Sequence, residues 1–191
     1  MRALGQVFTG DQLEKIGNTV IYLSGKIPNM SKTKLLKLLY ILDELSIERR
    51  GIPFLNLQYK LWKLGPVNEE IFIDLSDDRH FLGNYIKVRA TEDAVFITPA
   101  KEFCDDEFSD HDMMLMDMVI RKFGKKTGRE LIEYTHREGA PWYRTAIDNH
   151  VLNMLLEERM NNTEIVIDMG MLISHDEHKY GLYKEYKELF S

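Results

Sequence analysis

One leucine-rich segment constrains the fold of this chain more than any other: residues 31–51, SKTKLLKLLYILDELSIERRG. Ser31 can accept a backbone hydrogen bond at a helix start, and Gly51 can take the left-handed conformation in which helices often end. Apolar side chains cover most of the circumference and leave one narrow polar ridge, consisting of Lys34, Lys37, Glu44 and Glu48. Because a helix of this kind must be buried on most sides, we expect it at the centre of the core.

The rest of the sequence predicts further helices and one hairpin. The Thr residues at positions 9 and 127 are each followed three residues later by Gln or Glu, the capping-box spacing of a helix start. Periodicity and end signals place helices at residues 9–25, 67–75, 113–124, 127–138, 150–160 and 178–190. Residues 85–98 alternate as a β-hairpin does, and residues 164–169 are irregular or strand-like. A lone hairpin needs a surface to pack on, so the predicted fold is mainly α (α+β): a compact helical domain with a small antiparallel β-hairpin packed on it.

The length of 191 residues suits one domain with its own hydrophobic core. The chain has no internal repeat, no low-complexity tract and no linker long enough to divide it. We therefore expect a single domain over residues 1–191, with a first helix at 9–25 and a tail helix at about 178–190. The single cysteine, Cys104, excludes an internal disulfide and fits a reducing compartment. Without a signal segment or a long apolar run, the expected location is cytoplasmic, with no membrane partner.

Charge is distributed unevenly along the chain. The net charge of −6 argues against a protein that mainly coats nucleic acid. However, residues 1–66 contain ten Lys or Arg against five Asp or Glu, whereas residues 67–191 contain fifteen against twenty-six. Such an asymmetry indicates either a basic face with a partner or two halves that attract each other across the fold. The basic N-terminal third also leaves open a nucleic-acid-binding transcriptional regulator as the alternative function.

The sequence contains no recognisable catalytic or cofactor-binding motif. Phosphate-binding loops, dinucleotide fingerprints, serine-hydrolase elbows and zinc-protease motifs are all missing. His175 and His178 could share a helical face, but two imidazoles without a third ligand do not make a metal site. Asp43 and His136 are the candidates for small-molecule chemistry, although a hydrogen-bonded structural role is expected for both. The prediction is a non-enzymatic chain with no catalytic residue, cofactor or metal.

Two aromatic and basic clusters surround proline-containing turns. The first is YKLWKLGPVNEE, residues 59–70, and the second is THREGAPWYR, residues 135–144. Trp, Tyr and Arg dominate interface hot spots because each combines a large contact area with a directed donor. Two interpretations stay open: each tryptophan anchors its turn to the core, or the aromatic and basic side chains form a protein-binding surface.

Together with KTKLLKLLYILDELSIERRGIPF, residues 32–54, these clusters give three motif blocks within residues 32–144. This arrangement resembles the SocA-like Panacea domain, the antitoxin-associated domain of many bacterial and phage-borne toxin–antitoxin pairs. One departure is Leu64, at a position where many members carry an aromatic residue. The candidate motif or partner-binding residues are Lys37, Tyr40, Tyr59, Trp62, Lys63, Gly65, Pro66, Val67, Thr135, His136, Pro141 and Trp142.

The resemblance implies a mostly helical fold and a non-enzymatic role, in which the chain binds a cognate protein toxin and neutralises it. A related version is an adaptor that passes the bound toxin to a protease. Some relatives append a DNA-binding module, but residues 1–30 offer one amphipathic helix, which is too little for a helix-turn-helix. Nucleic acid is therefore an unexpected partner, and the sequence does not predict the oligomeric state.

Overall fold

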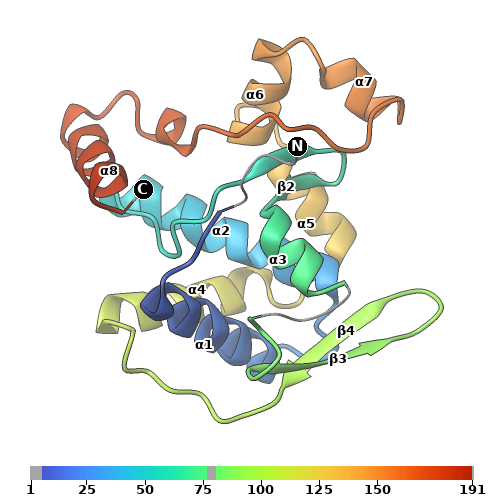
Figure 1. Cartoon of the computed structure of the whole chain (residues 1–191). Coiled ribbons are helices and arrows are strands. Elements are labelled where there is room, and N and C mark those ends of the chain that lie inside the picture. Colours follow the sequence, from blue (N-terminus) through green and yellow to red (C-terminus); the bar gives the residue numbers. More distant parts are fainter. Residues whose placement is uncertain (1–5, 77–80, 191) are drawn as a thin grey trace.

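A computed structural model of the chain describes residues 6–76 and 81–190 (Figure 1). Its elements are α1 (Gly10–Lys26), α2 (Lys32–Arg50), β1 (Lys60–Trp62), β2 (Gly65–Val67), α3 (Glu69–Asp74), β3 (Ile86–Ala90), β4 (Val95–Pro99), α4 (Asp110–Phe123), α5 (Gly128–Thr135), α6 (Pro141–Asp148), α7 (Leu152–Leu156), the 3₁₀ turn η1 (Met169–Leu172) and α8 (Glu177–Leu189). Helices predominate and the strands form two small antiparallel pairs, which confirms the predicted fold class.

Helix α2 is the centre of the core, as its sequence predicts. The Ser31 hydroxyl accepts a hydrogen bond from the backbone N–H of Lys34, and Gly51 closes the helix with a φ of +73°. Helices α1, α4, α5 and α8 all contact α2, and so do strands β2 and β4 (Figure 1). This shell of neighbours leaves little of the helix in contact with solvent.

The polar ridge predicted on this helix is wrong for three of its four residues. Lys34, Lys37 and Glu44 are all buried. The reason is that α5 and β2 pack on the side of α2 where the ridge was expected. Amphipathic periodicity identifies a polar stripe but does not reveal that distant segments of the chain will cover it.

The structure contains the predicted hairpin and a second one that the sequence analysis did not predict. Strands β3 and β4 pair antiparallel over residues 86–99, one residue beyond the expected end at 98, and β4 packs against α1. The unpredicted hairpin pairs β1 with β2 around a turn at residues 63–64. The sequence places this turn at Gly65 and Pro66, but these residues begin β2. Strands of three residues are too short to show the alternation that identifies longer ones.

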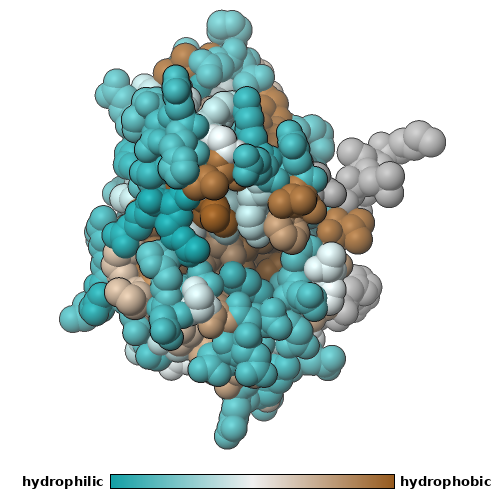
Figure 2. Space-filling model, turned by 90° about the vertical axis from the view of Figure 1, so that its left-hand side faces the viewer, coloured by the Kyte–Doolittle hydropathy of each residue, from teal (hydrophilic) through white to brown (hydrophobic). Residues whose placement is uncertain are grey.

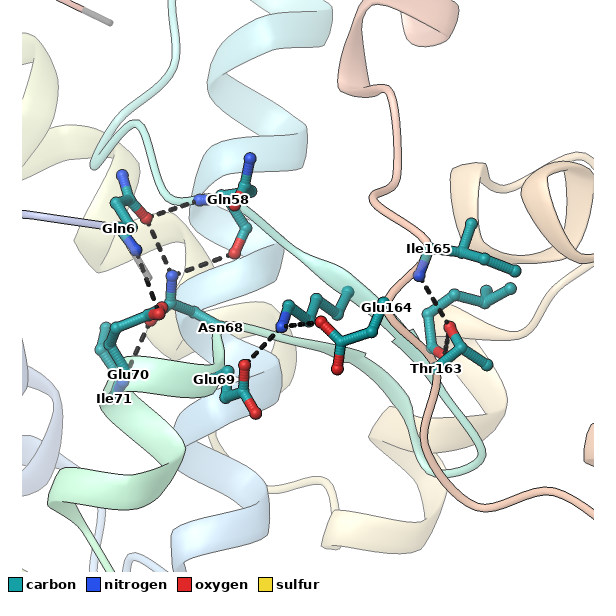
Figure 3. A network of polar contacts seen from close by, with 11 residues as sticks. Gln6, Gln58, Asn68, Glu69, Glu70, Ile71, Thr163, Glu164 and Ile165 are labelled. Atoms are coloured by element: carbon teal, nitrogen blue, oxygen red, sulfur yellow. Dashed lines mark hydrogen bonds and ion pairs between the residues drawn. The ribbon is translucent and has the colours of Figure 1, made fainter. Parts of the chain in front are cut away.

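Residues 161–167 run alongside β1 and extend this small sheet. The backbone N–H of Leu61 donates to the carbonyl of Ile165 at 2.8 Å, and the N–H of Ile167 donates to the carbonyl of Tyr59 at 2.8 Å. Side chains reinforce the pairing: the Lys60 amine contacts Glu164 of this segment and also Glu69 at the start of α3. Both carboxylates are labelled in Figure 3. The strand-like character expected for residues 164–169 is thus observed as pairing with β1.

The segment after Gly139 departs most from the prediction. The sequence predicts a helix that ends at residue 138, a turn around Pro141, and one further helix at 150–160. The structure has α6 starting at Pro141 and the five-residue α7 after it. Proline is well suited to the first helical position because its missing N–H would have no partner there. Within residues 6–76 and 81–190, no helix is both long and apolar enough to cross a membrane.

Candidate functional site

The three motif blocks meet around the side chain of Lys37, in the second turn of α2. This side chain is 1% exposed, and its Nζ donates to the carbonyl oxygen of Pro66 at 2.9 Å. Burial removes the hydration that stabilises the ammonium form, which lowers the pKa of Lys37 to about 7. The first and second blocks are therefore joined by a buried amine.

Gly65 allows the second and third blocks to come together. Its φ is +100°, and a Cβ atom at this position would lie 2.8 Å from Oγ1 of Thr135 and 3.1 Å from Nζ of Lys37. A side chain would thus be disfavoured by the backbone conformation and also by its neighbours. The Thr135 hydroxyl is held in place because it donates to the carbonyl of Ile132 at 3.0 Å.

His136 and Trp142 form a stacked pair behind the amine. Their ring centroids are 3.7 Å apart with an interplanar angle of 16°. Burial, together with the nearby positive charge of Lys37, lowers the pKa of His136 to about 4, so the imidazole is neutral at pH 7. Trp142 is 0% exposed, and its indole N–H donates to the carbonyl of Trp62 at 2.8 Å. Trp142 therefore anchors β1 to α6, as the core interpretation expects.

Trp62 lines a cavity of about 240 Å³, to which Lys37 also contributes. Its ring packs edge-on against Phe72 with centroids 5.0 Å apart. Its Nε1 atom is buried, and in the described part of the chain it has no hydrogen-bond partner. We call this cavity the Lys37 pocket; it is lined by Thr33, Leu36, Lys37, Trp62, Lys63, Leu64, Val67, Phe72, Asn161 and Asn162.

Tyr40 and Tyr59, two other candidate residues, belong to a separate cluster deeper in the core. Tyr59 donates to Asp43 at 2.8 Å, and the backbone N–H groups of residues 55–57 also donate to this carboxylate. Burial raises the pKa of Asp43, while these hydrogen bonds oppose the shift. Asp43 thus fixes the loop that follows α2, which is the structural role expected for it.

One ion pair, with a fully buried carboxylate, was not predicted from the sequence. Arg137 bonds to Glu44 at 2.9 Å, and the Glu44 side chain is 0% exposed. Tyr40 donates to the same carboxylate oxygen at 3.3 Å. Burial raises the pKa of Glu44, whereas the positive charge of Arg137 lowers it. A glutamate on an otherwise apolar helix and an arginine within the third motif block were the only signals of this pair.

Other candidates from the sequence do not form a site. Cys104 is exposed and free. No group of three potential metal-binding side chains occurs in residues 6–76 and 81–190, and His80 lies outside the described residues. A second hollow of about 530 Å³ lies between the end of α8 and the start of α1, and Figure 2 shows apolar side chains gathered in it. Its lining includes Phe54, Leu189 and Phe190.

Comparison with known proteins gives one family. The model of the family described as antitoxin SocA-like, Panacea domain, matches residues 35–143, which is more than half of the chain. A search of curated proteins found no match, and neither did a search of solved structures. The matched residues extend from α2 into α6 and so include Lys37, Gly65 and Trp142. The chain belongs to the SocA-like antitoxin family and carries its Panacea domain.

Proposed function

We propose that this chain is the antitoxin of a toxin–antitoxin pair and neutralises a cognate protein toxin by direct contact. The observation that carries the proposal is the convergence of all three motif blocks around Lys37, within the part of the chain that matches the antitoxin family. Side chains that are distant in the sequence pack against one another there and hold the β1–β2 hairpin in place. We propose that the surface of this hairpin contacts the toxin.

The surface above the cluster has the composition of a protein-binding site. The turn of the β1–β2 hairpin carries Lys63 and Leu64, and Leu64 is 53% exposed. Trp62 lies next to them, with its ring against Phe72. An aromatic ring, an exposed aliphatic group and a cation in one place are typical of interface hot spots. The buried residues, including Lys37 and Trp142, would act by holding this turn in place rather than by touching the partner.

The test is rescue of growth. Toxin and antitoxin genes are expected side by side, so the product of the adjacent open reading frame is expressed alone and then with this chain. We expect the neighbour to stop growth by itself, and this chain to restore growth and to co-purify with it. Failure to restore growth, or rescue without a complex, would contradict neutralisation by direct contact.

The adaptor version makes a different prediction about the toxin. If this chain passes the toxin to a protease, the half-life of the toxin in cells falls when the chain is present. If it neutralises by occupancy, the half-life is unchanged or longer. A pulse-chase measurement separates these two outcomes.

The ion pairs of the basic N-terminal third argue against the alternative function, nucleic-acid binding. Lys15 and Arg50 both pair with Asp112, at 3.5 and 3.4 Å. Lys60 pairs with Glu69 and Glu164. The charge asymmetry therefore corresponds largely to attraction between the two parts of the chain. A regulator that binds nucleic acid would still reveal itself as a complex that weakens steeply with salt.

A further inference from the structure

The Lys37 pocket combines apolar walls with hydrogen-bond donors. Leu36, Val67 and Phe72 give it a hydrophobic lining. The buried amine of Lys37 and the ammonium group of Lys63 belong to the same lining, and two asparagine amides complete it. No carboxylate is among its lining residues as the described chain forms them. The charged groups at the pocket therefore favour an anionic ligand.

Two donors at this pocket have unused capacity. In its protonated form the Lys37 amine has three N–H groups, one of which donates to the carbonyl of Pro66. The indole N–H of Trp62 is buried, and no acceptor for it lies in the described ranges. Because an indole nitrogen can donate but not accept, it needs an acceptor from outside the described chain, on a ligand or a water molecule. A carboxylate has two oxygens and can accept from both groups at once.

The surroundings add to the positive charge. Lys63 pairs at 2.9 Å with Glu158, a side chain that is 71% exposed. The amine of Lys32 lies 3.5 Å from the ring centroid of Phe72, one of the wall residues. Exposed ion pairs contribute little stability, so Lys63 can exchange Glu158 for a ligand at little expense.

We propose that the Lys37 pocket binds the C-terminal residue of a protein partner, with its carboxylate on Lys37 and Trp62 and its apolar side chain against Phe72. This inference rests on the proposed function and names how the toxin would be recognised. A C-terminal residue places a carboxylate and an apolar group on the same carbon atom, which suits a cavity of about 240 Å³. An internal acidic residue would bring the charge without the apolar group and would need room for the chain on both sides.

The first test uses N-acetyl-leucine and its amide as matched probes of the full chain. The indole N–H signals of Trp62 and Trp142 are followed by NMR and assigned with the Trp62→Phe variant. A ligand of this size commonly binds with a Kd of about 1 mM. We expect a saturable shift of the Trp62 signal with the acid, and binding at least ~10-fold weaker with the amide. Equal binding of the two probes, or no shift up to roughly 20 mM, would overturn the proposal.

Three variants locate the binding. Trp62→Phe keeps a ring but removes the donor, and Lys63→Met removes a charge, so each should weaken binding of the acid about 5-fold or more. Lys125→Met is the matched control, because Lys125 is exposed and outside the pocket lining. Its affinity should equal that of the wild type. Thermal melting of each variant shows whether it is folded, and unchanged affinity in folded Trp62→Phe and Lys63→Met would overturn the assignment.

The second test uses an octapeptide with the last eight residues of the neutralised toxin, with a free or an amidated end. The free acid should bind more tightly than N-acetyl-leucine and than its own amide. A peptide no tighter than the single residue would overturn recognition of a protein terminus and indicate a small carboxylate instead. Growth rescue is scored separately. Rescue by a chain that does not bind the acid leaves the antitoxin function intact and refutes only this inference.

Discussion

Lys37→Met should remove a large part of the pH dependence of folding stability. In the unfolded chain this lysine keeps its proton up to a pH of about 10.5, whereas in the folded protein burial lowers its pKa to about 7. Between these two values the unfolded state binds more protons, so the free energy of unfolding of the wild type rises with pH. Methionine has a similar length, does not titrate and suits an apolar site. The variant should therefore lack this rise.

The expected size of the effect follows from the difference in proton binding. Each pH unit inside the window contributes up to ~1.4 kcal/mol, so the interval from about pH 7 to about pH 9 contributes roughly 2 kcal/mol. The free energy of unfolding of Lys37→Met minus that of the wild type should therefore be larger, by that amount, at about pH 7 than at about pH 9. The loss of the hydrogen bond to Pro66 changes both values equally and cancels in the comparison.

The groups that face Lys37 do not disturb the comparison. His136 is the titratable neighbour, and it loses its proton between about 4 in the folded state and 6.5 in the unfolded state, below the window. The other facing groups are the Pro66 carbonyl and the Thr135 hydroxyl, which do not titrate in this range. Tyr59, whose pKa is raised well above 10, releases its proton above the window.

The measurement is urea unfolding of both proteins at the two pH values, with Lys125→Met as the control for loss of a surface charge. The control should keep the pH dependence of the wild type. A constant stability difference between wild type and Lys37→Met at the two pH values would refute the reasoning. It would mean that Lys37 keeps its proton in the folded protein at neutral pH.

Two further substitutions have controls within the chain. Gly65→Ala should lower the free energy of unfolding by roughly 2 kcal/mol or more, because it combines an unfavourable φ with the contact to Thr135. The control is Gly139→Ala: Gly139 has a φ of +79° and open space around it, so this variant should lose only ~1 kcal/mol. Equal losses of the two variants in urea unfolding would contradict this prediction. Glu44→Gln should lose about 1.5 kcal/mol, because it removes a charged hydrogen-bond acceptor from the partly exposed Arg137. Glu133→Gln breaks an exposed pair within one helix turn and should lose at most ~0.5 kcal/mol, and a similar melting temperature for the two variants would argue against this ranking.

The features predicted correctly from the sequence are those encoded locally. Helix α2, its Ser31 cap and its Gly51 end depend on residues within one segment, and so do the capping boxes of α1 and α5. The hairpin β1–β2 depends instead on residues 161–167, about a hundred positions further along the chain. Its three-residue strands carry no pattern of their own. Helix α6 was missed for a different reason, since a proline can either end one helix or begin the next.

The candidate site was predictable as a set of residues but not as a geometry. The motif blocks indicated Lys37, Trp62 and Trp142 without showing which would be buried. Lys37 and Trp142 are buried, and each donates a hydrogen bond to a backbone carbonyl: Lys37 to that of Pro66, and Trp142 to that of Trp62. Every residue has a backbone carbonyl, so the residue types in the sequence do not indicate which carbonyl accepts such a hydrogen bond. Periodicity therefore predicted a solvent-facing lysine where the fold has a buried amine.

Charge compensation decreases toward the Lys37 pocket. Lys60, in the same strand as Trp62 but outside the lining, contacts two carboxylates, and Lys63 in the lining contacts one that is largely exposed. For Lys37 the described structure offers a carbonyl oxygen and no carboxylate within ion-pair distance. Several cations of residues 1–66 are thus paired with carboxylates of the later part of the chain, whereas the described residues place none beside Lys37. The net charge of −6 repels an anionic partner at long range. Close to the Lys37 pocket, however, the local field is positive and attracts an anionic group that fits the cavity.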